Sequence, residues 1–213
     1  LHGLLGVVMS YGMQILRPDG NLWLSPEVTP MNLIDKGVMA GINGEVFQTR
    51  IPSGIPAIFF VRMQNELYAS FSQIDQNGYN SLRIDVNAGV GSIHIYAFAA
   101  MVVSPPAFGI AMYDASGKMI YHGNMRPLEC YQVASQGTNT RIDVGYLAAV
   151  CPVQMSVYSV VNSSVGGWNI FVSSSSASGS IVSTPSRQVA NTSGPAGFIW
   201  SNSMLVINAS KYD

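Results

Sequence analysis

The sequence predicts an all-β fold made of two related β-sandwich domains in tandem. Three observations lead to this prediction. Apolar residues alternate with polar ones along several segments, turn signals separate those segments, and parts of the first half recur in the second. Helical periodicity is hard to find, and short strands separated by turns rich in Gly, Pro and Asn are typical of sandwiches and barrels.

A hairpin pattern occurs twice. Residues 11–24 align without gaps on residues 108–121, with apolar residues at equivalent positions. Each copy predicts an apolar strand, a tight turn in which a glycine supplies the positive φ, and an apolar return strand. We take the glycines that coincide in the two copies as structural turn residues: Gly12 with Gly109, and Gly20 with Gly117.

Two further matches follow in the same order. Residues 49–54 resemble residues 140–145, and each of these segments is followed by an apolar run. A weaker match sets residues 82–86 beside residues 168–172. Because the matches keep their order while their offset drifts slowly, they indicate an internal duplication in which the copies gained or lost loop residues.

The domain boundary is expected at Pro105 and Pro106, since consecutive prolines remove backbone donors and interrupt a strand. The predicted division is an apolar N-terminal extension over residues 1–8, a first domain over 9–104 and a second domain over 105–213. The extension is either an upstream or trimmed segment or a strand that docks on a neighbouring subunit.

The second domain is expected to carry an extra C-terminal hairpin. Strand-like residues 198–200 and 204–207 flank a short polar turn at 201–203. This hairpin would complete the sheet of the second domain or, alternatively, pair with the edge of another subunit.

Charged residues are scarce. They make up 10% of the chain, against about 25% in an average domain, while 48% of the residues are hydrophobic and the net charge is −1. Such a surface favours association, so we expect a protein held in an assembly. No basic run is present for nucleic acid, and the apolar segment 1–9 is far shorter than the roughly 20 residues of a membrane span.

The sequence predicts no metal, cofactor or catalytic site. His2, His94 and His122 are isolated from one another and from both cysteines, so no zinc spacing is present. Cys130 and Cys151 do not form the framework of a disulfide-rich secreted domain, which makes a reducing compartment the expectation. Their pairing in a disulfide is the alternative.

Candidate groups for catalysis and sugar binding are not organised into motifs. No Gly-x-Ser-x-Gly elbow occurs. Acids that could act in glycoside hydrolysis are present, but no spacing selects a pair: Asp75, Asp85, Glu66 and Glu129. Trp23, Trp168 and Trp200 each lie in a strand-like run, which favours core or interface packing over a carbohydrate platform.

The two hairpin phrases, residues 11–20 and 108–118, resemble the opening strand and turn of small tail proteins of long-tailed siphophages and related prophages. The second copy fits better, because Arg17-Pro18-Asp19 replaces the usual turn residues in the first. The resemblance implies a virion protein at the tail tip or in a fibre, assembled in the bacterial cytoplasm in three or six copies. It brings no catalytic residues.

Three functional hypotheses follow. The first is a non-enzymatic structural tail protein, at the tail tip, baseplate or fibre adaptor, that contacts other tail proteins and further copies of itself. The second is a receptor- or glycan-binding module, which aromatic residues gathered on one exposed loop face would favour. The third is a depolymerase-like enzyme, which would need two acids facing each other across a groove.

Overall fold

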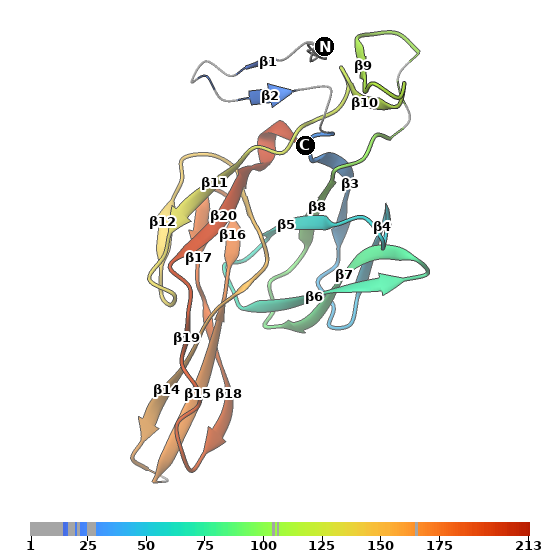
Figure 1. The fold of residues 1–213 in the computed structure, drawn as a ribbon. Helices are drawn as coiled ribbons and strands as arrows, with labels where there is room; N and C mark the ends of the chain where they lie inside the picture. Colours follow the sequence, from blue (N-terminus) through green and yellow to red (C-terminus); the bar gives the residue numbers. More distant parts are fainter. Residues whose placement is uncertain are drawn as a thin grey trace, which may run out of the picture.

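The chain is all-β, as predicted. The computed structural model describes residues 15–16, 20, 22–24, 29–103, 105, 107–164 and 166–213. Within these ranges the strands pair antiparallel, and the only helical segment is one 3-10 turn, η1 (Ala209–Lys211). Figure 1 shows a sandwich-like body, two small hairpins at one end and a long arm at the other.

A six-stranded sheet forms the centre of the body, in the order β11-β20-β13-β5-β8-β3. Its strands are β3 (Asn32–Met39), β5 (Ala57–Met63), β8 (Ile93–Ala99), β11 (Cys130–Ala134), β13 (Ala148–Val150) and β20 (Ser203–Asn208). The first three come from the first predicted domain and the other three from the second. The two groups meet where Val61 of β5 pairs with Val150 of β13.

Two three-stranded sheets pack against one face of this central sheet. One has the order β4-β7-β6 and the other the order β12-β17-β16. Their strands are β4 (Val46–Pro52), β6 (Ala69–Gln76), β7 (Tyr79–Asn87), β12 (Arg141–Asp143), β16 (Ser176–Ser178) and β17 (Ile181–Ser183). Apolar side chains from both small sheets and from the central sheet form one continuous core.

The central strands are buried on both faces. In β8, Ile95 and Ala97 face the main core, whereas Tyr96 and Phe98 face a second cluster on the opposite side of the sheet, as the alternation of a strand requires. Phe98 makes an edge-on contact with Tyr212, with ring centroids 5.0 Å apart. A nearly continuous apolar run is typical of a strand covered on both sides.

The two predicted hairpins are present as β1 (Ile15–Leu16) with β2 (Leu22–Leu24) and β9 (Ala111–Tyr113) with β10 (Met119–His122). Their registers correspond: Leu16 pairs with Leu22 in the first, and the aligned residues Tyr113 and Met119 pair in the second. Each hairpin also shifts register at the same aligned step.

The turn glycines adopt the backbone that the hairpins need. Gly20 has a φ of 83° and Gly117 a φ of 82°, the region that glycine enters without steric cost. Gly109, just before β9, has a φ of 137°. Gly12 and residues 1–8 lie outside the described residues, as does Pro106 of the predicted boundary.

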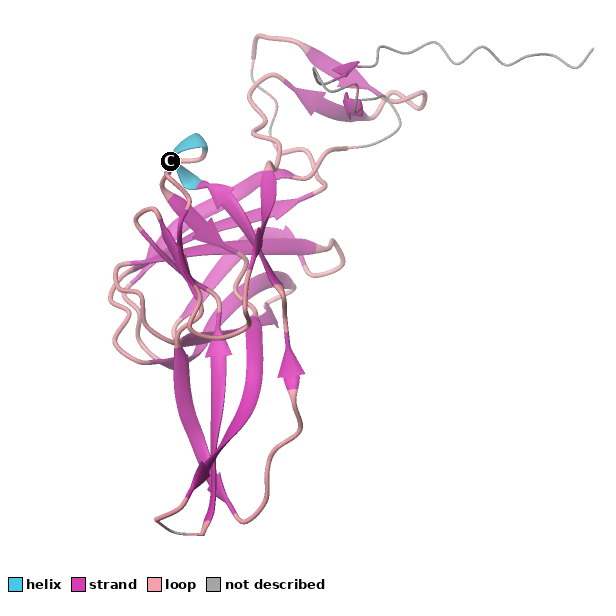
Figure 2. Cartoon of the chain, turned by 90° about the vertical axis from the view of Figure 1, so that its left-hand side faces the viewer, coloured by secondary structure: helices cyan, strands magenta, loops and turns pink. Residues whose placement is uncertain are grey.

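The arm is a four-stranded sheet in the order β18-β15-β14-β19. Its strands are β14 (Gln154–Asn162), β15 (Gly167–Ser174), β18 (Ser186–Thr192) and β19 (Ile199–Trp200). Figures 1 and 2 show this sheet extending away from the body. The sequence did not predict an arm.

The predicted C-terminal hairpin is wrong. β19 pairs with β14 of the arm, whereas β20 lies between β11 and β13 in the central sheet. Met204, Val206 and Ile207 of β20 are buried, so this strand gains more from the centre of the body than from a two-stranded hairpin.

The weaker repeat match joins strands with different positions in the fold. Residues 82–86 lie in β7, over the main core, while residues 168–172 lie in β15 of the arm. Alternation of apolar residues is common to both strands, and it does not distinguish a core strand from an arm strand. The arrangement as two related sandwiches in tandem stays a prediction, and in the structure both predicted domains contribute to one sheet and one core.

Candidate functional site

His94 and His122 lie on different strands, β8 and β10, apart from Cys130 on β11, and His2 lies outside the described residues. His122 is buried, with Nε2 3.0 Å from the carbonyl oxygen of Val103. Burial, together with the nearby Arg62, lowers the pKa of His94. Within the described ranges, no group of three or more His, Cys, Asp and Glu side chains could hold a metal ion. The described ranges also contain no helix with the length and hydropathy of a membrane span.

Both cysteines are free thiols, so the disulfide alternative is not realised. Cys130 and Ala149 flank Ile207 from opposite sides, which places β20 between the strand of Cys130 and the strand that leads to Cys151. Burial raises the pKa of the Cys151 thiol to about 11. Cys151 is therefore protonated at neutral pH and has little thiolate character.

Each of the four candidate acids forms a turn hydrogen bond or an ion pair. Asp75 accepts a hydrogen bond from the backbone N–H of Gly78, 2.8 Å away. Glu66 forms two hydrogen bonds with Arg141, at 2.9 and 3.0 Å, and thereby links the two halves of the chain. Asp85 pairs with Arg83, and Glu129 pairs with Lys211.

The most unusual surface of the molecule is the arm. Residues 154–200, which include the four arm strands and also β16 and β17 of the body, contain a single charged side chain, Arg187. Large apolar side chains are exposed along this segment: Val160, Val161, Val189, Phe198, Ile199 and Trp200. An exposed sheet with no lysine and a single arginine largely lacks the charges that normally keep strands from pairing with other chains.

One long edge of the arm is only partly paired, and the loop before β19 contacts it where the backbone N–H of Ala196 donates a hydrogen bond to Oγ of Ser159 at 2.9 Å. β19 pairs with β14 only at Ser156 and Val157, so residues 158–162 of β14 have no strand partner on that side within the described residues. Val161, in this stretch, is 62% exposed. An open edge with exposed β-branched residues is a template for a further strand or for apolar packing.

Two aromatic rings stack at the base of this edge. The ring centroids of Phe198 and Trp200 are 5.7 Å apart, and the ring planes are 7° from parallel. Phe198 is 72% exposed and Trp200 is 43% exposed. Gly137 lies against Trp200 so closely that a Cβ there would be 2.5 Å from Cε2 of the indole. Trp200 thus contacts both Gly137 and Phe198, and the ring of Phe198 is largely exposed to solvent.

Buried serines attach the arm to the body. Ser173 of β15 donates a hydrogen bond to the carbonyl oxygen of Gly137 at 2.6 Å, and its Oγ lies 2.6 Å from Oγ of Ser156 on β14. Both serines are fully buried. This chain of hydrogen bonds fixes the two long arm strands to the loop that supports Trp200.

Sequence reasoning located Trp200 in a strand but missed its exposure and its partners. The signal that could have found the arm is the near-absence of charge over residues 154–200. No protein-family model matches the chain, and neither the curated proteins nor the solved structures give a match.

Proposed function

We propose that this chain is a non-enzymatic structural protein of a phage tail, located at the tail tip, baseplate or a fibre adaptor. It works by contacting other tail proteins, including further copies of itself. The observation that carries this proposal is the arm, an extended sheet with one charge, an open edge and exposed aromatic residues. The resemblance of the hairpins to siphophage tail proteins supplies the tail, assembly in the bacterial cytoplasm, and an expectation of three or six copies.

The lack of charge favours a second copy as the partner of the arm. A charged partner would leave its own ions desolvated and unpaired against residues 154–200, which costs free energy. Two arms that face each other bury apolar and amide-rich surface with almost no like-charge repulsion. The stacked Phe198–Trp200 pair supplies the kind of aromatic anchor that dominates interface energetics.

We also propose that the chain arose by internal duplication. After its hairpin, each half contributes six body strands in the same spatial order. When the body strands of each half are numbered along the chain, the third, sixth and first strands lie side by side in the central sheet, as β5-β8-β3 in the first half and β13-β20-β11 in the second. The second, fifth and fourth strands lie side by side in a covering sheet, as β4-β7-β6 in the first half and β12-β17-β16 in the second. This order supports two related units joined edge to edge. The four arm strands are additions to the second unit.

The test compares lysine substitutions at matched exposed positions. Val161→Lys places a charge on the open arm edge, whereas Ile42→Lys places one at a position that is 65% exposed and lies outside the arm. We expect the wild type and Ile42→Lys to form oligomers of equal mass in light scattering. Val161→Lys should weaken association at least about tenfold.

Two outcomes would contradict the proposal. One is a monomeric wild type that antibody labelling does not find in particles of the phage encoding it. The other is a Val161→Lys variant that associates as tightly as the wild type, which would remove the arm from the interface.

A second candidate function is receptor or glycan binding at the tail tip. The exposed Phe198–Trp200 stack favours it, because aromatic rings gathered on one surface also bind sugars and receptor side chains. Phe198→Ala distinguishes the two functions: loss of cell binding by an intact oligomer indicates a receptor contact, while loss of the oligomer itself indicates a subunit contact.

A further inference from the structure

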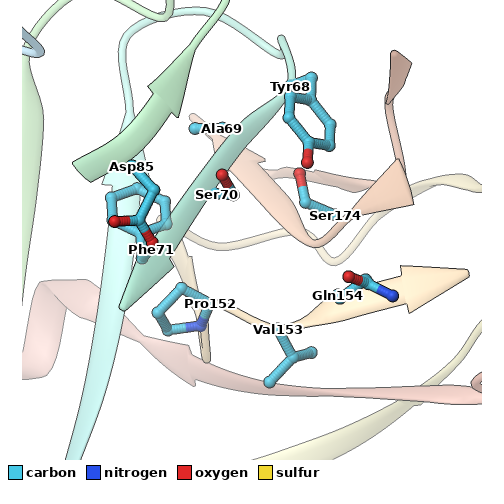
Figure 3. Close-up of a pocket in the computed structure, with 9 residues that line it drawn as sticks. All are labelled: Tyr68, Ala69, Ser70, Phe71, Asp85, Pro152, Val153, Gln154 and Ser174. Atoms are coloured by element: carbon cyan, nitrogen blue, oxygen red, sulfur yellow. The ribbon is translucent and has the colours of Figure 1, made fainter. Parts of the chain in front are cut away.

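A pocket of about 220 Å³ lies where the two halves of the chain meet. Tyr68, Ser70 and Asp85 line it from the first half, and Gln154 and Ser174 line it from the second. Figure 3 shows these side chains around a common space, with Pro152 and Val153 along one side. The volume is below the range of roughly 300–1,000 Å³ typical of sites for drug-sized ligands, so a single ring is a better match.

The pocket holds hydrogen-bonding groups that the protein does not use. The side chain of Ser174 is buried, with 4% of the residue exposed, and its hydroxyl has no hydrogen-bond partner. A buried hydroxyl without a partner is uncommon because its desolvation is uncompensated. Ser70 and Gln154 add a hydroxyl and an amide from opposite sides of the pocket.

The charge of the lining excludes most ions. No lysine or arginine lines the pocket, so an anion would find no counter-charge there. The one carboxylate, Asp85, already pairs with Arg83 at 2.7 Å and accepts a hydrogen bond from Ser72. Its remaining lone pairs can accept hydrogen bonds from hydroxyl groups without requiring a cation.

The apolar part of the lining is the ring of Phe71 with the side chains of Pro152 and Val153. A ligand that suits both parts is small, neutral and ring-shaped, with hydroxyl groups around its edge and C–H groups on its faces. We propose that this pocket binds one neutral sugar ring, as a free monosaccharide or as the end of a glycan. The side chains of Asp85, Gln154 and Ser174 would form hydrogen bonds with the hydroxyl groups of the sugar.

This site lies outside the exposed edge of the arm and does not require self-association. It can therefore fail while the proposed structural function stands, and the reverse also holds. Because its walls come from both halves of the chain, the pocket exists only when the two halves are packed together.

The test uses the full chain and ligand-observed NMR titrations with free glucose, galactose, mannose and N-acetylglucosamine. Ser174→Ala and Gln154→Ala each remove one hydrogen-bonding group from the pocket. Gln48→Ala is the matched control, an exposed glutamine on β4 that does not line the pocket. Gln154 is also exposed, so both glutamine variants should fold as the wild type does.

We expect at least one of these sugars to bind the wild type and the Gln48→Ala variant with equal affinity. Ser174→Ala and Gln154→Ala should each weaken binding roughly threefold to tenfold, the effect of losing one hydrogen bond. Absence of binding by all four sugars at millimolar concentrations would overturn the proposal. So would binding that neither pocket variant weakens.

Discussion

Gly137 has two properties that sequence inspection does not separate. Its φ of 76° lies in the region that favours glycine, and its missing side chain leaves room for the indole of Trp200. Gly145 has nearly the same φ, 74°, but a Cβ at that position would meet nothing within 4 Å. The two glycines therefore share the backbone requirement and differ in the close approach.

We predict that Gly137→Ala destabilises the protein more than Gly145→Ala. The control should cost about 1–2 kcal/mol of unfolding free energy through left-handed backbone strain alone. Gly137→Ala adds the displacement of Trp200, for a total of about 2–4 kcal/mol. Denaturant unfolding gives the free energies, and tryptophan fluorescence reports the moved indole. Equal losses in the two variants would show that Gly137 does not position Trp200.

For single residues, short sequence patterns predicted the backbone conformation of the turn glycines, because that conformation depends on nearby residues only. The positive φ of Gly20 and Gly117 follows from a turn between two apolar strands, which is visible within a dozen residues. The contact of Gly137 with Trp200 joins residues far apart in the chain. No short-range pattern encodes it, so the candidate site could not be assembled from the sequence.

Among the elements, the arm is attached to the body by buried hydrogen bonds as well as by Met155 of β14, which lies in the main core. Ser156 and Ser173 are fully buried where β14 and β15 leave the body. Their hydroxyl groups are hydrogen-bonded to each other, and Ser173 donates a hydrogen bond to the carbonyl oxygen of Gly137. Buried hydroxyl groups in such a chain need every partner, because each unsatisfied group retains its desolvation penalty.

We predict that Ser173→Ala lowers the unfolding free energy by about 1–3 kcal/mol, since it leaves the Ser156 hydroxyl and the Gly137 carbonyl unsatisfied. Ser163→Ala, in the exposed turn between β14 and β15, should change it by less than about 0.5 kcal/mol. Ser156→Ala combined with Ser173→Ala should cost less than the sum of the single changes. Additive losses would contradict a shared network.

Element prediction succeeded for hairpins and failed for long-range pairing. The registers of the β1–β2 and β9–β10 hairpins agree with the alignment of residues 11–24 on 108–121. β19 and β20 are neighbours in sequence and were expected to pair, yet they belong to different sheets. Which strands lie side by side depends on how the whole core is filled, and alternation within one strand carries no information on that.

For the whole molecule, the main question is whether the two halves behave as one folding unit. Val61 and Val150 pair across the junction of β5 and β13, and both are fully buried. The main core, between the central sheet and the two three-stranded sheets, contains residues from both halves. A domain with its own core unfolds independently, whereas a shared core makes the loss of either half expose the other.

We therefore predict a single cooperative unfolding transition for the full chain, with fluorescence and circular dichroism curves that coincide. Val150→Ala should lower the unfolding free energy by about 1–3 kcal/mol, through lost burial and a residual cavity, and should shift both curves together. Val38→Ala, at a 58% exposed position of β3 outside the arm, is the control and should leave the midpoint nearly unchanged. Two separate transitions, with Val150→Ala moving only one of them, would show that the halves fold as independent domains. A single transition would mean that the two units of similar strand order unfold cooperatively, as expected if the edge-to-edge junction of β5 and β13 stays formed until the whole chain unfolds.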